Sequence, residues 1–401
     1  MKNLKPLVWL SALVLIVAMF AIVACTPSKT IKAPEPNELG VITAEQWKDI
    51  YPDIYDSYRM NSSNSDNPSY LTQYPFLATI YNGVGFANSY NEARGHLYTL
   101  QDVAATGRPH AAANCLTCKS PEMTALVNSE GIEVYMRPFD EVYALINEPV
   151  SCYNCHANNT EGVLEVTAGY LKDALGADIS RIDLGLAVCG QCHNEYYFDP
   201  VTKATTLPWK GLSNMNPDAI LAYYNQINFS DFTNGISGAA MIKVQHPEFE
   251  TVLGVGSMAA TMGNGICDNC HTGIMENDKG EEYTSHFWQS PLTNTALLEA
   301  KCRSCHTDLA SQVAVIQTNT HDRLVTIGEK LASLHIKIGE AANAGASDAL
   351  LAQVRSMVRD GQFYYDFVFV ENSYGAHNSA LTKQLLDKAE KIIDEALALL
   401  K

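Results

Sequence analysis

The sequence of 401 residues has a formal charge of −17, with 44 acidic and 27 basic side chains. Because a nucleic-acid-binding protein needs a basic face, this composition excludes nucleic acid as a partner. The length is sufficient for a large buried core, and an acidic exterior by itself indicates no more than solubility.

The N-terminus has the three successive regions of an export signal. Charged residues occur in "MKNLK", an apolar run extends from Leu7 to Ala24, and Cys25 follows small residues in "IVAC". This order resembles a bacterial lipoprotein signal, so we predict a signal peptide over residues 1–24 and a lipidated Cys25. An uncleaved membrane helix is the alternative, because 18 apolar residues are just long enough to span a bilayer.

Both alternatives place the rest of the chain outside the cytoplasm, in the periplasm or on the outer face of the cytoplasmic membrane. Residues 25–45 are expected to form a tether between the lipid and the folded protein. The stretch "TPSKTIKAPEPNE" within them is rich in proline and poor in apolar side chains, which is typical of a linker.

The eleven cysteines divide into one residue of the signal and five Cys-x-x-Cys pairs, so none is left over. Four pairs are followed directly by histidine, which is the signature of covalent c-type haem attachment. Disulfides or zinc sites are the alternatives for paired cysteines, but neither explains why the histidine recurs. The four motifs, each with its histidine expected under the haem iron, are Cys152, Cys155 and His156; Cys189, Cys192 and His193; Cys267, Cys270 and His271; and Cys302, Cys305 and His306.

The first pair, Cys115 and Cys118 in "CLTCK", has Lys119 in the position of the histidine. It lies 37 residues before the second pair, the same interval that separates the second and third pairs, so we place it in the series as a fifth haem site. A lysine amine binds iron once it has lost a proton, and the charge of a metal favours that loss. The alternative is that Lys119 is exposed to solvent and this haem takes its ligand from elsewhere.

Five haems supply much of an apolar interior, so residues 46–310, the haem region, need few long regular elements. Apolar runs there are broken by "NSSNSDNPS", "GNG" and "NMNP", and no alternating strand pattern persists. In residues 311–401, apolar residues at helical spacing predict long amphipathic helices that pack on the haem region as one compact unit and also make a dimer seam. These positions are Leu324, Ile327, Leu331, Leu334, Ile338, Leu381, Leu385, Ala389, Ile392, Ala396 and Leu399. The predicted fold is mainly α, a multihaem cytochrome c fold with few strands.

Haems that only carry electrons need two strong axial ligands, whereas a haem that performs chemistry needs one open position. Among the seven histidines outside the motifs, the best candidates for second ligands are His96, His286 and His377, because small or aromatic neighbours can pack on a haem face. His335 is expected to be an ordinary surface or core residue. The remaining histidines are His110, His246 and His321.

One C-x-x-C-K and four C-x-x-C-H motifs in this order, with "YNEARGHLY", "CHNEYYF" and "KVQHPEFE", resemble pentahaem cytochrome c nitrite reductase. The resemblance covers residues 75–380 and implies an oxidoreductase that reduces nitrite to ammonium with six electrons and eight protons. It implies five c-type haems and calcium as cofactors, with Lys119 as the proximal ligand of the catalytic haem. A membrane quinol-oxidising multihaem cytochrome as electron donor and a homodimer are further implications.

The resemblance places Tyr196 and His246 in the distal pocket of the catalytic haem. The arginine of that pocket is expected to be Arg108, with Arg94 as the alternative, because the segment before the first motif is shortened. An arginine supplies a fixed positive charge, while histidine and tyrosine donate hydrogen bonds and protons at the leaving oxygens. Without the resemblance, Tyr196 is better interpreted as haem packing and His246 as part of a surface loop.

The same motifs carry the calcium site of the family. The resemblance implies the Glu195 carboxylate, the backbone carbonyls of Tyr196 and Lys243, and the Gln245 side chain as ligands, an oxygen-only set that suits a hard cation. Calcium beside the haem adds positive potential for an anionic substrate. A structural role in holding the two motifs together is the alternative.

The sequence departs from the family after the H-P-E motif. The resemblance implies a further histidine there that caps an electron-transfer haem, that of the last motif, whereas "TVLGVGSMAATMGNG" contains none. We expect Met258 to take that place, since a thioether is a strong enough ligand and raises the reduction potential above that of bis-histidine haems. Met262 and the spare histidines His110, His321 and His335 are the alternatives.

Two other functions remain open from the sequence. In a pure electron carrier, Lys119 only tunes a reduction potential, and the protein binds neither nitrite nor cyanide. The second alternative is a related multihaem enzyme that acts mainly on hydroxylamine or sulfite, because the activities of such enzymes overlap with those of nitrite reductases.

Overall fold

The computed structural model describes residues 31–109, 111–254, 256–257 and 266–401. Residues 1–24 of the predicted signal, Cys25, His110, Met258 and Met262 lie outside this part of the chain. Residues 34–401 form one compact unit. In the described part, no helix combines the length and the apolar character that crossing a bilayer requires.

The end of the predicted tether belongs to the folded unit. Val41 and Ile42 are buried, and helix α2 (Ala44–Trp47) begins at the cap Thr43, whose side chain accepts a hydrogen bond from the backbone N–H of Gln46. The linker therefore ends near Gly40, whereas the sequence analysis predicted a tether over residues 25–45.

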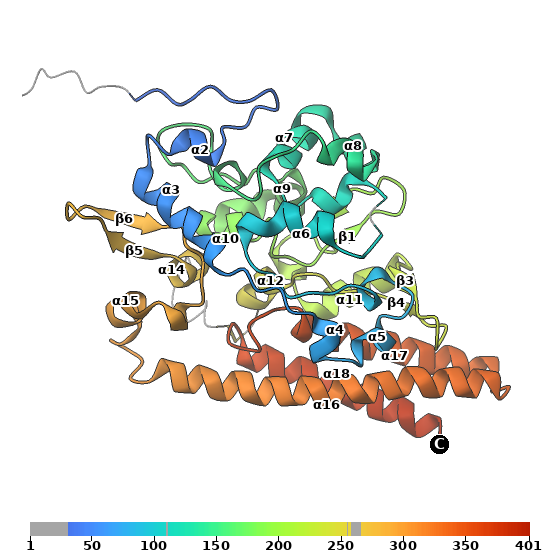
Figure 1. Ribbon diagram of the computed structural model, residues 1–401. Coiled ribbons are helices and arrows are strands. Elements are labelled where there is room, and N and C mark those ends of the chain that lie inside the picture. The colour runs from blue at the N-terminus through green and yellow to red at the C-terminus, as the bar shows by residue number, and fades with distance from the viewer. Residues whose placement is uncertain (1–30, 110, 255, 258–265) are drawn as a thin grey trace, which may run out of the picture. The chain divides into compact units, whose positions relative to one another are not determined.

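Short helices connected by loops make up the haem region (Figure 1). Local signals explain their bounds. In α7, the Ser120 hydroxyl accepts a hydrogen bond from the backbone N–H of Glu122, Pro121 is the first helical residue, and Gly131, with φ of 93°, ends the helix. The helices of this region are α2, α3 (Pro52–Arg59), α4 (Tyr70–Gln73), α5 (Leu77–Ile80), α6 (Thr99–Ala105), α7 (Pro121–Glu130), α8 (Phe139–Tyr143), α9 (Gly169–Leu175), α10 (Leu184–Cys189), α11 (Pro217–Gln226), α12 (Glu248–Leu253), α14 (Ile266–His271) and α15 (Thr295–Leu297).

The strands of the described residues form three separate two-stranded antiparallel sheets. The pairs are β1 (Tyr197–Phe198) with β2 (Thr205–Thr206), β3 (Phe232–Thr233) with β4 (Ala240–Met241), and β5 (Gly273–Glu276) with β6 (Glu282–Ser285). The first hairpin directly follows Tyr196, and β4 leads into the segment of Lys243 and His246. The sheets therefore fix the two segments to which the sequence assigns the distal pocket.

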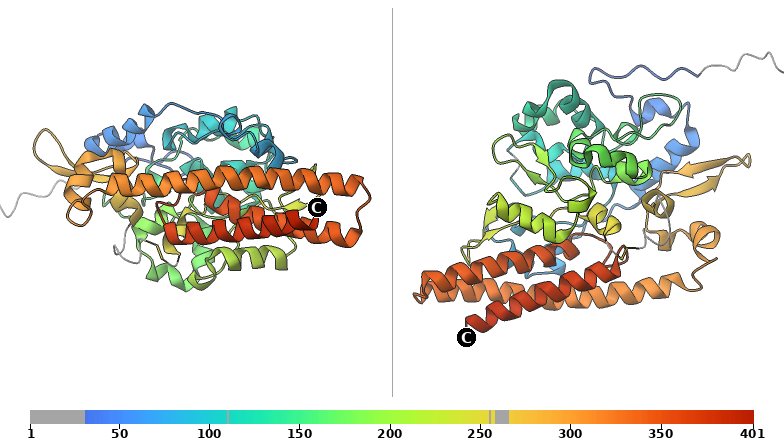
Figure 2. Two further views of the ribbon diagram at one scale, coloured as in Figure 1. Left: turned by 90° about the horizontal axis from the view of Figure 1, so that it is seen from below. Right: turned by 180° about the vertical axis from the view of Figure 1, so that it is seen from behind.

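Three long helices, α16 (Leu309–Asn343), α17 (Asp348–Phe369) and α18 (Ser379–Leu399), run side by side along one side of the haem region (Figures 1 and 2). As predicted, Leu324, Leu331 and Leu385 are buried. In the last helix, however, Ile393 is buried instead of Ile392, and Leu399 is exposed. The apolar stripe advances four residues from Ala389 to Ile393, which keeps it on one helical face.

One hydrophobic core joins these helices to the haem region. It contains Leu77, Tyr81, Phe249, Leu331 and Val358, which are nearly or fully buried. A second, smaller core surrounds the first Cys-x-x-Cys pair, with Leu116 and Met123 fully buried. The mainly α fold with few strands and long C-terminal helices therefore agrees with the sequence prediction.

Candidate active site and haem ligands

Each Cys-x-x-Cys-His motif forms a tight helical turn. The backbone N–H groups of His156, His193 and His306 donate to the carbonyl of the first cysteine of their motif, at 2.9, 3.0 and 2.8 Å. None of the ten cysteines of the motifs is paired in a disulfide. Such a turn brings two thiols and one imidazole to the same side of the backbone, which is the arrangement that covalent haem attachment needs.

The motifs follow one another closely in space. Thiols from neighbouring motifs interact in pairs, and the third motif is adjacent to the first, second and fourth. These pairs are Cys118 with Cys192, Cys155 with Cys189, Cys189 with Cys267, and Cys270 with Cys302. Groups attached to these thiols lie in a continuous series, as electron transfer among them requires.

Two pairs of histidines outside the predicted distal pocket have the separation of axial ligands to one iron, and the rings of His193 and His246, whose Nδ1 atoms both lie near Glu248, are 6.3 Å apart. The ring centroids of His156 and His286 are 6.0 Å apart, and those of His271 and His377 are 5.9 Å apart. Because a metal–imidazole bond is about 2 Å long, two rings on opposite sides of one iron have centroids roughly 6 Å apart. The residues therefore fit two bis-histidine haems.

The other ring nitrogen of these histidines also has the partner expected of a metal ligand. Nδ1 lies 3.1 Å from the Gly162 carbonyl in His156, and 3.0 Å from the Thr284 carbonyl in His286. A carbonyl accepts only from a protonated Nδ1, so Nε2 keeps its lone pair for a metal. In the same way, Nδ1 of His271 lies 3.0 Å from the Gln289 carbonyl, and Nδ1 of His377 bonds to the carboxylate of Glu371.

His96 lies close enough to His193 and Lys119 to interact with both. Its ring packs edge-on against Trp288 at 4.6 Å, and desolvation lowers its pKa to about 3, so the imidazole is neutral. A neutral imidazole is the form that binds a metal. The carboxylate of Glu248 lies 3.6 Å from Nδ1 of His193.

The remaining histidines differ from these. Both ring nitrogens of the buried His335 are engaged, Nδ1 with the Ser237 hydroxyl and Nε2 with the Gln362 amide oxygen, each at 2.9 Å, so this residue has no lone pair for iron. His321 lies against Tyr74 and next to Asp322. In the described part of the chain, His306 has no imidazole partner of the kind seen above. Ligation by Met258 stays a prediction, because that residue is outside the described part.

Lys119 has a different backbone arrangement from the motif histidines. Its N–H donates to the Leu116 carbonyl at 3.0 Å, and its own carbonyl accepts from the Thr99 hydroxyl at 2.8 Å. The half-buried side chain interacts with the thiol of Cys115 and with His246. Lys119 is thus close to both the first thiol pair and the predicted distal histidine.

Arg108 and Arg94 have different surroundings. The guanidinium of Arg94 forms an ion pair with Asp102 at 2.7 Å, and this carboxylate neutralises it. Arg108 interacts instead with Tyr196 and Cys115, and its guanidinium lies 4.2 Å above the ring of Phe86. The structure therefore brings Arg108, not Arg94, together with the first thiol pair.

The distal pair, Tyr196 and His246, lies beside the same motif. Desolvation raises the pKa of Tyr196 well above its usual value and lowers that of His246 to about 4. Both side chains are thus uncharged at neutral pH, the tyrosine as a hydroxyl donor and the imidazole as a neutral donor and acceptor. Glu248 lies 4.0 Å from Nδ1 of His246 and accepts a hydrogen bond from Asn372 at 2.8 Å.

The predicted calcium ligands lie together. One oxygen of the fully buried Glu195 carboxylate accepts from the Tyr224 hydroxyl at 2.9 Å, and the other accepts from the Gln245 N–H at 2.7 Å. The Gln245 side chain reaches the Lys243 carbonyl at 2.7 Å. Burial raises the pKa of Glu195 well above its usual value, and the nearby carboxylates of Glu250 and Asp231 raise it further. The oxygen atoms of these residues suit a hard cation.

Three groups in this region were not identified from the sequence. They are Glu248, between His193 and His246; Glu371, on His377; and Phe86, under Arg108. Only Glu248 could have been found from the sequence, because it lies two residues after His246. The pairing of the others depends on contacts between distant segments.

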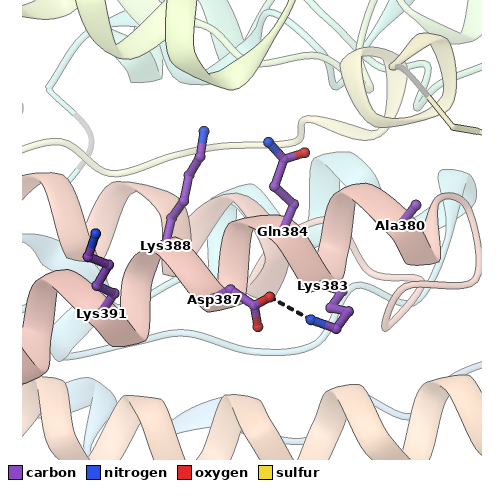
Figure 3. A pocket seen from close by; sticks show the side chains of 6 residues that line it. All are labelled: Ala380, Lys383, Gln384, Asp387, Lys388 and Lys391. Carbon is purple, nitrogen blue, oxygen red and sulfur yellow. Dashed lines mark hydrogen bonds and ion pairs between the residues drawn. The ribbon is translucent and has the colours of Figure 1, made fainter.

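A hollow of about 360 Å³ on α18 carries lysines but lies outside this region (Figure 3). Lys383 pairs with Asp387 at 2.6 Å, and Lys388 pairs with Asp218 at 2.6 Å. These carboxylates neutralise the lysines, so the hollow is not an alternative anion site.

Three comparisons with known proteins agree with one another. The sequence profile of the family "Cytochrome c552" matches residues 43–401. A cytochrome c-552 from Desulfotalea psychrophila (strain LSv54 / DSM 12343) is 32% identical over an alignment of 377 positions that covers 86% of this chain and 72% of that protein. Among solved structures, the catalytic subunit of the cytochrome c nitrite reductase from Desulfovibrio desulfuricans ATCC 27774, described with two calcium sites, has a TM-score of 0.80 and 28% identity, covering 89% of this chain and 86% of that chain.

Proposed function

Since this chain belongs to the cytochrome c552 family, we propose that it reduces nitrite to ammonium at the haem of the Lys119 motif. Membership in that family makes it a c-type haem protein and an oxidoreductase. The observation that carries the proposal is the convergence of Lys119, Arg108 and Tyr196 on the thiol pair of the first motif, with His246 next to Lys119. An electron carrier has no need for such a set of side chains around one haem.

The haems, when bound, supply the electrons and an iron with one open position for the nitrogen of nitrite. The overall change is balanced when one nitrite takes up six electrons and eight protons and gives one ammonium and two waters. The Arg108 guanidinium attracts the anion and holds its oxygens by charge-assisted hydrogen bonds. The Tyr196 hydroxyl and the His246 ring donate to these oxygens, which leave as water when they have received protons.

Calcium is the second proposed cofactor, held by the Glu195 carboxylate, the carbonyls of Tyr196 and Lys243, and the Gln245 side chain. The buried carboxyl group of Glu195 and its contacts with the Gln245 segment support this assignment. Calcium would link the segment of Tyr196 to that of His246 and add positive potential beside the pocket. The related enzyme from Desulfovibrio desulfuricans is described with two such sites.

We propose that the protein is exported and anchored to the membrane by a lipid on Cys25, with residues 46–310 as the catalytic region and residues 311–401 as the dimerisation region. The homodimer seam is proposed along the long helices α16 to α18. A membrane quinol-oxidising multihaem cytochrome is the proposed electron donor. Gel filtration with light scattering, and mass spectrometry of the mature N-terminus, test the dimer and the anchor.

The central experiment is steady-state ammonium formation from nitrite with a reduced viologen as electron donor. Hydroxylamine and sulfite are measured in parallel with the same enzyme. We expect ammonium formation to account for all the viologen oxidised in the presence of nitrite. A protein that binds neither nitrite nor cyanide is an electron carrier, and a much higher kcat/KM for hydroxylamine or sulfite assigns the second alternative.

A further inference from the structure

The ring of Phe86 lies under two cations. The Cζ atom of Arg108 is 4.2 Å from the ring centroid, and the Nζ atom of Lys243 is 4.9 Å from it. Both distances are within the range of cation–π attraction. Phe86 therefore contacts the arginine of the proposed pocket and a residue of the proposed calcium segment at the same time.

Other aromatic rings fix Phe86 in place. Phe86 packs edge-on against Tyr90 with centroids 4.9 Å apart, and Tyr81 lies 6.2 Å away. The Tyr81 hydroxyl donates to the buried carboxylate of Asp366 at 2.8 Å. The Lys243 ammonium lies 5.0 and 5.5 Å from the rings of Tyr81 and Tyr90, so the three rings form a cage around it.

The Arg108 side chain also contacts its own segment and the backbone next to Phe86. Its Nε donates to the Thr106 hydroxyl at 3.1 Å. Its aliphatic stem lies on Gly85, where an added Cβ would be 3.1 Å from both Cβ and Cγ of Arg108. Glycine at position 85 therefore lets the stem lie close to the backbone, and the plane of the guanidinium rests on the neighbouring Phe86 ring.

The two cations also repel each other. Arg108 contributes to lowering the pKa of the buried Lys243, which shows that the charges interact in a poorly solvated region. The face of an aromatic ring attracts both cations at once and so offsets this repulsion. An aliphatic side chain in place of Phe86 does not offset this repulsion, so we expect the guanidinium, which is the less buried of the two groups, to shift away from the ammonium.

We propose that Phe86 is a positioning residue that holds the Arg108 guanidinium over its ring and thereby sets how strongly the distal pocket binds an anionic substrate. The proposal rests on the function proposed above, in which Arg108 contacts nitrite. Phe86 itself contacts neither substrate nor haem iron in this role. Its effect is on charge placement, so it distinguishes charged from neutral substrates.

The kinetic test compares nitrite with hydroxylamine, which is uncharged at mildly alkaline pH, in the holoenzyme. Phe86→Leu keeps an apolar side chain but removes the ring face, and we expect KM for nitrite to rise roughly tenfold while KM for hydroxylamine changes little. Phe86→Tyr restores the ring and should restore the nitrite KM. Tyr364→Leu is the matched control, because it removes a ring under Lys388, 5.1 Å away, in the C-terminal helices.

A second readout does not depend on turnover. Phenylglyoxal modifies arginine side chains, and mass spectrometry of peptides gives the rate at Arg108 alone. We expect faster modification of Arg108 in Phe86→Leu, the wild-type rate in Phe86→Tyr, and no change at Arg94, which its ion pair with Asp102 holds in every variant.

The variant Arg108→Gln distinguishes a wrong role for Arg108 from a wrong role for Phe86. If it leaves the ratio of the nitrite and hydroxylamine KM values unchanged, the proposed role of Arg108 itself is wrong. If it changes that ratio while Phe86→Leu changes neither the ratio nor the labelling rate, only the positioning role of Phe86 is overturned. An equal rise of both KM values in Phe86→Leu also overturns it, since that is a general structural effect.

Discussion

The imidazole rings of His156 and His286 face each other with centroids 6.0 Å apart, although 130 positions separate the two residues. Nδ1 of each ring is engaged by a backbone carbonyl, so the two Nε2 atoms are the ones available to a metal between them. This relationship gives the second motif its proposed bis-histidine haem. It also shows how β6, which ends one residue before His286, positions the second ligand.

Replacing His286 with alanine tests this pair. We expect all five haems to remain attached, because the thiols of the motifs are unchanged, while one low-spin signal in the electron paramagnetic resonance spectrum is lost. Haem content is measured as the pyridine haemochrome. His321→Ala is the matched control, since His321 lies against Tyr74 and Asp322 and is expected to leave every low-spin signal intact. An unchanged spectrum in His286→Ala contradicts the assignment.

Lys119→His tests the unusual ligand. A histidine should still bind the iron and keep five haems, but the stronger ligand changes the electron density at the iron, so we expect most nitrite turnover to be lost. Ammonium formation and haem content are measured on the same preparation. Full activity in this variant would show that the lysine is not required for the reaction.

The distal donors are tested by two substitutions of similar size, His246→Asn and Tyr196→Phe. Each should lower ammonium formation by about 10²-fold or more, the loss expected when a positioned proton donor is removed. Arg94→Gln serves as a control outside the pocket, because Arg94 is paired with Asp102. A loss of haem content in place of turnover would mean that these residues only support the fold.

Local patterns were sufficient for the haem motifs and for the long helices. Leu324 and Leu331 lie on a single helix, and their spacing alone predicts a buried face. Contacts between distant segments were not accessible in this way. Glu371 follows the end of α17 at Phe369 and binds His377 in the loop beyond it. Phe86 reaches Arg108 because the Arg108 side chain packs on the neighbouring Gly85. Neither relationship has a periodic signal in the sequence. The prediction named Ile392 as buried, but Ile393 is the buried residue. Such an error arises because successive residues on one helical face can be three or four positions apart.

Removing calcium should affect the distal pocket without affecting the electron-transfer haems. We expect a chelator, or Glu195→Ala, to lower nitrite turnover while the low-spin signals remain. Because burial raises the pKa of Glu195, protons compete with calcium for this carboxylate, so calcium affinity should weaken as the pH falls. Isothermal titration with calcium at several pH values measures this. Asp322→Ala, which removes an exposed carboxylate on α16, is the control, and an affinity independent of pH contradicts the assignment.

The last prediction concerns stability and His335, which is fully buried between Ser237 and Gln362. Desolvation lowers its pKa from 6.5 to about 4 in the folded protein. The unfolded chain therefore binds more protons than the folded one between these two values, and the stability contributed by neutral His335 is lost as the pH falls from 6.5 towards 4. The full shift corresponds to about 3 kcal/mol of unfolding free energy.

His335→Gln provides the comparison, because glutamine keeps polar contacts with Ser237 and Gln362 but does not titrate. The contributions of all other groups are common to both proteins and cancel in the difference. We expect the variant to be less stable than the wild type near neutral pH, and this difference to shrink or reverse as the pH falls below 6.5. Calorimetric Tm values measured at several pH values give the result. A difference that stays constant over this range would mean that His335 takes up its proton in the folded state as readily as in the unfolded chain.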